Sequence, residues 1–136
     1  MAEKDYSHRS PIDKLGIKAG HAVVLLSHAW PLDQDLCRLA LERAGRGPAQ
    51  LDESADIVLI SVDDSTDAVS LLREWRARIR PAGGIWLLTA KRGRHGYVNQ
   101  NELIPAGLEA GMVDNKTCSV SETTRGIRFV IRKKDR

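Results

Sequence analysis

Short apolar runs alternate along the chain with longer segments whose apolar residues recur at helical spacing. Three of the runs are continuous enough to predict strands buried on both faces, and they lie at residues 21–27, 56–62 and 85–89. The first of these is predicted to be a central strand of the sheet. The predicted helices lie at residues 11–16, 33–44, 65–80 and 101–110.

Polar and glycine-rich residues mark the ends of these elements. Ser10 and Pro11 suit the start of the first helix, and Asp33 and Gly45 bound the second. Residues 46–54 have room for a short edge strand at 49–51. The Pro-Ala-Gly-Gly segment at 81–84 is predicted to end the third helix and to lead into the third strand. The chain closes with a predicted hairpin, residues 113–120 and 127–131.

Strands that alternate with helices imply an α/β fold, a three-layer Rossmann-like sheet that is mostly parallel. The last strand is predicted to run antiparallel, because the short turn at 121–126 joins it to its predecessor. A length of 136 residues fits one domain. We place this domain at residues 12–132, between a flexible N-terminal segment at 1–11 and a basic tail at 133–136.

The composition narrows the classes of partner. A net charge of +3 and an isoelectric point near 9.1 are compatible with anionic ligands. This charge is lower than that of a dedicated nucleic-acid-binding protein, so we expect weak, salt-sensitive nucleic-acid association. The polar segment Met1–Arg9 does not resemble a signal peptide or membrane span, which predicts a cytoplasmic protein without membrane association. Cys37 and Cys118 match no metal or redox spacing, and we expect reduced, partly buried thiols.

The order of elements, with the segment PAGGIWLL before and within the third strand, is similar to the core of the class I methyltransferases. The resemblance covers residues 12–132 and implies an S-adenosylmethionine site after the first strand. Ser27-His28-Ala29-Trp30-Pro31 stands where that family has an acidic, glycine-containing loop. The strand that would carry a ribose-binding acid is reduced to residues 49–52. The sequence therefore predicts a truncated methyltransferase-like fold with no bound cofactor.

A closer resemblance rests on the segments GGIWLLTAKRGRHGYV, AGLEAGMVDNKTCSV and ETTRGIRFV. They resemble the DUF3052 family, a small bacterial family of unknown function with no assigned activity to transfer. The residues that fit its pattern are Lys91, Glu122, Thr123, Gly126 and Arg128. The chain departs from the pattern at Thr124 and Arg125, which replace tryptophan and serine, and at Ala90, where a proline is usual.

Ligands of open α/β sheets bind beyond the carboxyl ends of the parallel strands. That rule predicts a rim of candidate ligand-binding residues, namely Ser27, His28, Trp30, Asp63, Asp64, Lys91, Arg92, Arg94, His95, Tyr97, Glu122 and Arg125. His28 and Asp63 could be a base and its orienting acid, or incidental neighbours. Asp63 and Asp64 could hold Mg²⁺, or could be an acidic helix cap. No catalytic or metal-binding residue is assigned.

The basic loop, residues 91–97, is the strongest candidate for function. It combines Lys91, Arg92 and Arg94 with two glycines, as an anion site requires, although a solvated surface loop has the same composition. The sequence favours a non-catalytic binding or interaction module for an anionic small molecule or a protein partner. A divergent methyltransferase-like transferase is the alternative, and nucleic-acid association through the loop and tail is a third reading.

Overall fold

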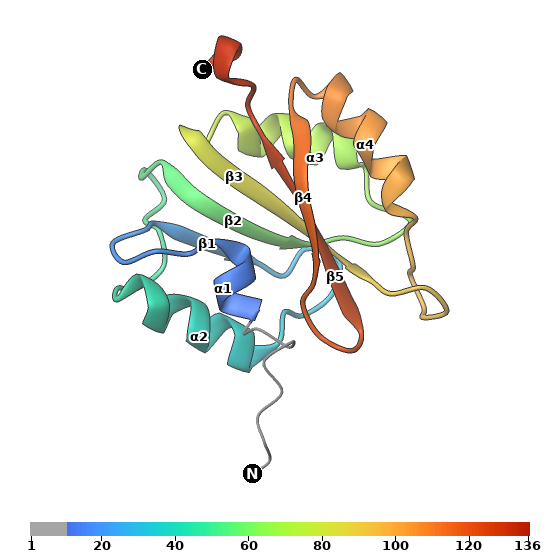
Figure 1. Cartoon of the computed structure of the whole chain (residues 1–136), viewed down its shortest axis with the longest axis horizontal. Coiled ribbons are helices and arrows are strands. Elements are labelled where there is room, and N and C mark those ends of the chain that lie inside the picture. The colour runs from blue at the N-terminus through green and yellow to red at the C-terminus, as the bar shows by residue number, and fades with distance from the viewer. Residues whose placement is uncertain (1–10) are drawn as a thin grey trace.

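The computed structural model describes residues 11–136, which form one five-stranded sheet with helices on both faces (Figure 1). The elements in chain order are α1 (Pro11–Leu15), β1 (Val23–Leu26), α2 (Gln34–Ala44), β2 (Ala55–Ser61), α3 (Ala68–Arg76), β3 (Ile79–Ala90), α4 (Gln100–Glu109), β4 (Val113–Ser119), β5 (Thr124–Val130) and a 3₁₀ turn, η1 (Lys133–Asp135). The expectations for residues 1–10, including the cap at Ser10, lie outside the described residues. Among residues 11–136, no helix has the length and apolar character needed to span a membrane.

The strands lie in the order β1-β2-β3-β5-β4, and β1, β2 and β3 run parallel. Strand β5 runs antiparallel to both of its neighbours, which confirms the predicted orientation of the last strand. The three-layer, mostly parallel fold is thus confirmed. At the end of β3, Ala90 pairs with Thr124, so the β4–β5 turn lies at the same rim as the carboxyl ends of the parallel strands.

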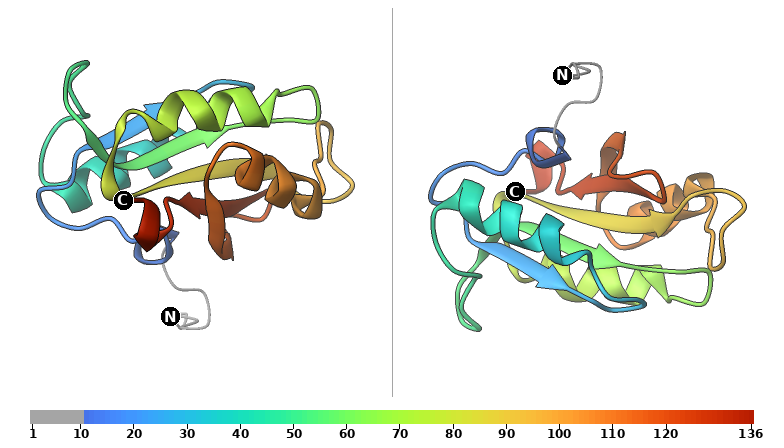
Figure 2. Two further views of the ribbon diagram at one scale, coloured as in Figure 1. Left: turned by 90° about the horizontal axis from the view of Figure 1, so that it is seen from above. Right: turned by 90° about the horizontal axis from the view of Figure 1, so that it is seen from below.

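Two apolar clusters fill the spaces between the sheet and its helices. One cluster packs α1 and α2 against one face, and the other packs α3 and α4 against the opposite face. Figure 2 shows this from two sides, with α3 in front of the sheet in one view and α2 in front in the other. Trp86 of β3 is fully buried, and its indole Nε1 donates to the carbonyl oxygen of Leu15 at 3.1 Å. The central strand is therefore tied directly to the end of α1.

The prediction that the first strand is central was wrong. Strand β1 is an edge strand, and Val24, Leu25 and Leu26 are half-buried. The predicted strand at 49–51 does not form. This segment contains glycine and proline, and it makes a single backbone hydrogen bond to β1, from the Ala49 N–H to the Val23 carbonyl at 2.9 Å.

Helix α3 is shorter than the predicted 65–80. Asp67 caps it by accepting from the Ser70 N–H at 3.1 Å, whereas Asp63 closes a separate turn before it. The expectation that Asp63 and Asp64 cap the helix was therefore wrong. At the other end the chain enters β3 at Ile79, so residues 81–84 lie inside a strand, at a register shift in its pairing with β2.

The loop at 46–54 is closed by a two-pronged ion pair in place of strand pairing. Arg46 Nη1 and Nη2 donate to Glu53 Oε2 and Oε1 at 2.7 and 2.6 Å. The Gln50 N–H adds a third bond to the same carboxylate at 3.1 Å. These bonds, led by those from Arg46, lower the pKa of Glu53 from 4.5 to about 2.

We predict that the Glu53 carboxyl titrates near pH 2 in an NMR-monitored titration, and that Arg46→Met returns the midpoint toward 4.5. Because the folded pKa is lowered, the stability contributed by this pair is complete above pH 4.5 and is lost as the pH falls toward 2. A wild-type midpoint at the ordinary value for glutamate would contradict the ion pair.

Candidate functional site

The loop between β1 and α2 is anchored to the end of β2 by the hydroxyl and the carbonyl of one buried residue. Ser61 is fully buried, and its Oγ accepts from the N–H groups of Ala29 and Trp30, each at 3.2 Å. The Ala29 N–H also donates to the Ser61 carbonyl at 3.0 Å. The same hydroxyl donates to the Trp30 carbonyl at 2.6 Å. The Trp30 indole Nε1 donates to the Val62 carbonyl at 3.0 Å. The backbone N–H groups of Ala29 and Trp30 are therefore used inside the protein.

The other polar residues of this loop also bond locally. Ser27 Oγ accepts from the Leu32 N–H at 3.0 Å, and Asp33 caps α2 by accepting from the Leu36 N–H at 2.8 Å. His28 is exposed to solvent. The predicted helix start at Asp33 and its end at Gly45, which has a φ of 72°, are both confirmed.

Asp63 follows β2 and is surrounded by donors from its own turn. Its Oδ1 accepts from the Ser65 N–H at 3.0 Å, from Ser65 Oγ at 2.9 Å and from Thr66 Oγ1 at 3.1 Å. The bonds from Ser65 are the main reason that the pKa of Asp63 is lowered, and the charge of His28 contributes least. Within residues 11–136, no hydrogen bond joins His28 to Asp63, and no group of three metal-ligating side chains occurs. This carboxylate therefore orders its own turn.

A pocket of about 760 Å³ lies between the β1–α2 loop, the start of α2, the basic loop and the β4–β5 turn. We call it the rim pocket. The predicted site residues that line it are Trp30, Asp63, Arg94 and His95. Its apolar wall includes Leu36, Leu39 and Val120. Because Asp33, Asp35 and Asp63 face a single arginine, the charge lining this pocket does not favour an anion.

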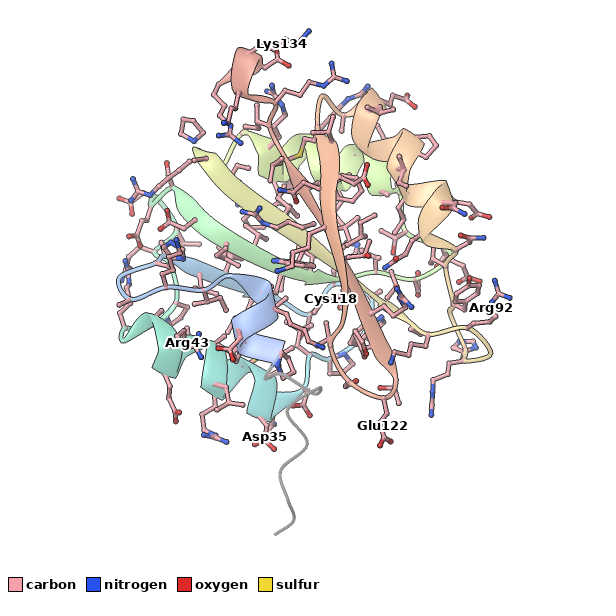
Figure 3. All side chains as sticks on the ribbon, in the orientation of Figure 1. Asp35, Arg43, Arg92, Cys118, Glu122 and Lys134 are labelled. Carbon is pink, nitrogen blue, oxygen red and sulfur yellow. The ribbon has the colours of Figure 1, made fainter. Side chains whose placement is uncertain are left out.

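A second hollow of about 500 Å³ lies on the α4 side of the sheet, and we call it the loop hollow. It is lined by Thr89, Lys91, Arg92, Tyr97, Val98, Asn99, Gln100, Asn101 and Arg125. The basic loop therefore contributes residues to two different hollows, because its Arg94 and His95 line the rim pocket instead. The predicted residues that line neither hollow are Ser27, His28, Asp64 and Glu122. Glu122 projects outward from the β4–β5 turn, and Arg92 lies at the right-hand edge of the molecule in this view (Figure 3).

The loop hollow forms where two strand ends meet the start of a helix. Thr89 near the end of β3 pairs with Arg125 of β5, and Asn99 caps α4 by accepting from the Asn101 N–H at 2.9 Å. The Arg92 guanidinium lies 6.0 Å from the centroid of the Tyr97 ring. Lys91 Nζ donates to Ser119 Oγ at 2.7 Å, which ties the loop to the hairpin.

One buried polar group in the loop hollow lacks a partner, and a second group lies beside it. Thr89 is 1% exposed as a residue, and its hydroxyl makes no hydrogen bond with another described residue but is not fully buried. The Gln100 side-chain Nε2 is buried and has no partner in residues 11–136. Sequence reasoning missed both residues, although a threonine that ends a buried apolar run was a visible signal for the first.

Solved structures with a similar fold include several methyltransferases. The CcbJ methyltransferase from Streptomyces caelestis aligns with a TM-score of 0.58 at 9% identity, over 89% of this chain and 88% of that one. A SAM-dependent methyltransferase from Aquifex aeolicus aligns with a TM-score of 0.55 at 11% identity, over 89% and 87%. The O-methyltransferase NcsB1 of neocarzinostatin biosynthesis aligns with a TM-score of 0.58 at 16% identity. The alignment covers 83% of this chain but 49% of NcsB1, about half its length. At sequence identities this low, the structural similarity shows a shared fold alone.

Sequence comparison identifies the family of the chain but assigns no activity to it. No curated protein matches the sequence. A family model described as "Protein of unknown function (DUF3052)" matches residues 12–133, nearly all of the sheet and its helices. With this match and the methyltransferase-like fold both established, the chain belongs to the DUF3052 family.

Proposed function

We propose that this protein is a binding module that holds the anionic group of a small molecule in the loop hollow. The main support for the proposal is Gln100 Nε2, which is buried and has no partner among the described residues, and which lies with the Thr89 hydroxyl in a hollow at the start of a helix and beside three cations. Buried polar groups are nearly always hydrogen-bonded in folded proteins, and leaving one unsatisfied costs about 1–3 kcal/mol. An oxyanion can accept from both groups at once.

The charge around the hollow favours the same class of ligand. Lys91, Arg92 and Arg125 line it, and no described carboxylate does. Helix α4 has ten residues, and its first residues line the hollow, so the positive end of the helix dipole lies beside it. A phosphate or carboxylate group would satisfy the donors and the charges together. An apolar or cationic ligand would satisfy neither.

Titration with inorganic phosphate, followed by NMR, tests the proposal. We expect phosphate to shift the side-chain amide signal of Gln100 and the backbone amides near Thr89. Because charge-assisted hydrogen bonds contribute about 1.5–3 kcal/mol, Arg125→Ala should weaken binding about tenfold or more. Arg94→Ala is the matched control, since it removes the same charge from the same rim but lines the rim pocket, and it should change affinity less than about twofold.

Lys91→Ala should also weaken phosphate binding, but it removes the bond to Ser119 Oγ as well, so Arg125 is the cleaner test. If phosphate leaves the Gln100 signal unmoved at millimolar concentration, or if Arg94→Ala and Arg125→Ala weaken binding equally, the loop hollow is not the anion site.

The methyltransferase-like fold raises the question of S-adenosylmethionine, since NcsB1 was solved with S-adenosyl-L-homocysteine. The residues present do not fit that cofactor. The loop after β1 has no glycine, and the N–H groups of Ala29 and Trp30 are bonded to Ser61. Residues 46–54 form no strand that could present a ribose-binding acid beside β1.

We therefore predict that S-adenosylmethionine does not bind appreciably. Isothermal titration calorimetry of the full chain should give no saturable heat, because the cofactor would have to displace the internal bonds of the β1–α2 loop. A dissociation constant in the micromolar range would overturn this prediction and would favour a divergent transferase.

A further inference from the structure

A third hollow, of about 380 Å³, lies on the α1 side of the sheet, at the amino ends of the parallel strands. We call it the basic hollow. Its charged lining consists of Lys14, Lys18, Arg80, Lys116, Arg128 and Asp56, with His21 beside them. Helix α1 has five residues and lies over part of this face (Figure 1). The basic hollow is thus separated from the loop hollow by the sheet and by its position along the strands.

Arg128 forms the floor of this hollow. It is the cross-strand partner of Trp86, and its guanidinium lies across Gly84 of the same strand. A Cβ atom at Gly84 would lie 2.8 Å from Arg128 Cζ and Nη2, so a side chain at Gly84 would displace the guanidinium. Glycine at position 84 therefore makes room for the arginine.

The guanidinium of Arg128 has no counter-charge. It makes no ion pair or hydrogen bond within residues 11–136, although Arg128 is half-buried. Burial, together with the nearby Arg136, lowers the pKa of Arg128. A partly buried, unpaired cation is unfavourable in the empty protein, and an anion bound there would relieve that cost.

Two lysines of the hollow are held in place without being neutralised. Lys116 Nζ donates to the Lys14 carbonyl at 2.7 Å, and Lys14 Nζ donates to the Ser119 carbonyl at 3.3 Å. Neither bond supplies a negative charge. Asp56 pairs with Arg80 at 3.1 Å, and its other oxygen accepts from the Ala22 N–H at 2.8 Å. Five lysine and arginine side chains thus face one carboxylate, which is already bonded on both oxygens.

We propose that the basic hollow is a binding site for a polyphosphate group, such as the diphosphate of a nucleotide-like ligand. An excess of four positive charges in so small a volume calls for a compact ligand with several negative charges, which one carboxylate or one monoanion does not supply. Nucleic acid is a poorer fit, because the charges gather in a hollow and Trp86, its aromatic residue, is fully buried and unable to stack on a base.

Inorganic pyrophosphate and inorganic phosphate are the probes, titrated into the full chain at fixed ionic strength and followed by NMR. We expect pyrophosphate to shift the amides of Gly16 and Ala82, which line the basic hollow, and to bind there at least about tenfold more tightly than phosphate. Affinity should fall steeply with added sodium chloride.

Arg128→Met removes the charge and keeps an unbranched side chain over Gly84, and it should weaken pyrophosphate binding at this site at least tenfold. Arg92→Ala is the matched control, since it removes a positive charge from the loop hollow and should leave the affinity of the basic hollow within twofold. This control also distinguishes the two proposals, because anion binding in the loop hollow uses Arg92, whereas pyrophosphate binding in the basic hollow uses Arg128. Lys18→Ala, at an exposed loop position, provides a second variant if Arg128→Met fails to fold, and it should weaken pyrophosphate binding.

Three results would overturn the proposal. The first is equal affinity for phosphate and pyrophosphate at Gly16 and Ala82. The second is shifts confined to the loop hollow. The third is tighter binding of a hexa-aspartate peptide than of pyrophosphate, which would assign the hollow to an acidic peptide instead.

Discussion

The buried hydroxyl of Ser61 is the constraint on which the organisation of the rim depends. It receives two N–H groups from the β1–α2 loop and donates to a carbonyl of the same loop. In a methyltransferase-like fold the loop after the first strand is the natural place for a ligand cradle. Here the N–H groups of Ala29 and Trp30 turn inward, the Trp30 indole donates to the Val62 carbonyl, and the candidate ligand-facing groups come from other elements. The fold is therefore shared with methyltransferases while the chemistry at this position is not.

The antiparallel pairing of β5 with β3 decides where those other groups lie. It brings Thr124 opposite Ala90 and Arg125 opposite Thr89, at the carboxyl end of the central strand. Side chains alternate between the two faces of a strand, so Ala90 lines the rim pocket while Thr89 and Lys91 line the loop hollow. The basic loop that follows is divided in the same way. A positively charged segment of sequence thus contributes to two sites of different character.

Helices and strands were predicted correctly where the local sequence signals, such as caps and apolar runs, were strong. The aspartate cap and the left-handed glycine of α2, and the apolar runs of β2 and β3, correspond to structure directly. The start of α3 could not be predicted, because Asp63 and Asp67 are both good caps and the chain uses the first for a turn that Ser65 and Thr66 complete. The edge position of β1 also escaped prediction, since it depends on whether residues 46–54 form a strand beside it.

The sites were less predictable than the fold, because they depend on pairing across long sequence separations. The family pattern included Arg128 but gave it no role. The position of the Arg128 side chain depends on Gly84, which lies 44 residues earlier and is brought beneath the arginine by strand pairing. Gln100 looked like an ordinary polar residue at the start of a helix, and its burial depends on how α4 packs beside the end of β3. The modest net charge of +3 concealed two separate concentrations of positive charge.

The β1–α2 loop is bonded internally at Ala29 and Trp30, and these N–H groups do not face a ligand. Amide hydrogen exchange of Ala29 and Trp30, measured by NMR on the free protein, tests it most directly. Internal bonds to a fully buried hydroxyl predict protection of both amides comparable to that of the core residues of β2. Exchange of Ala29 and Trp30 at the rate of an open loop would show that these internal bonds are absent, because those donors would then be free to bind a cofactor.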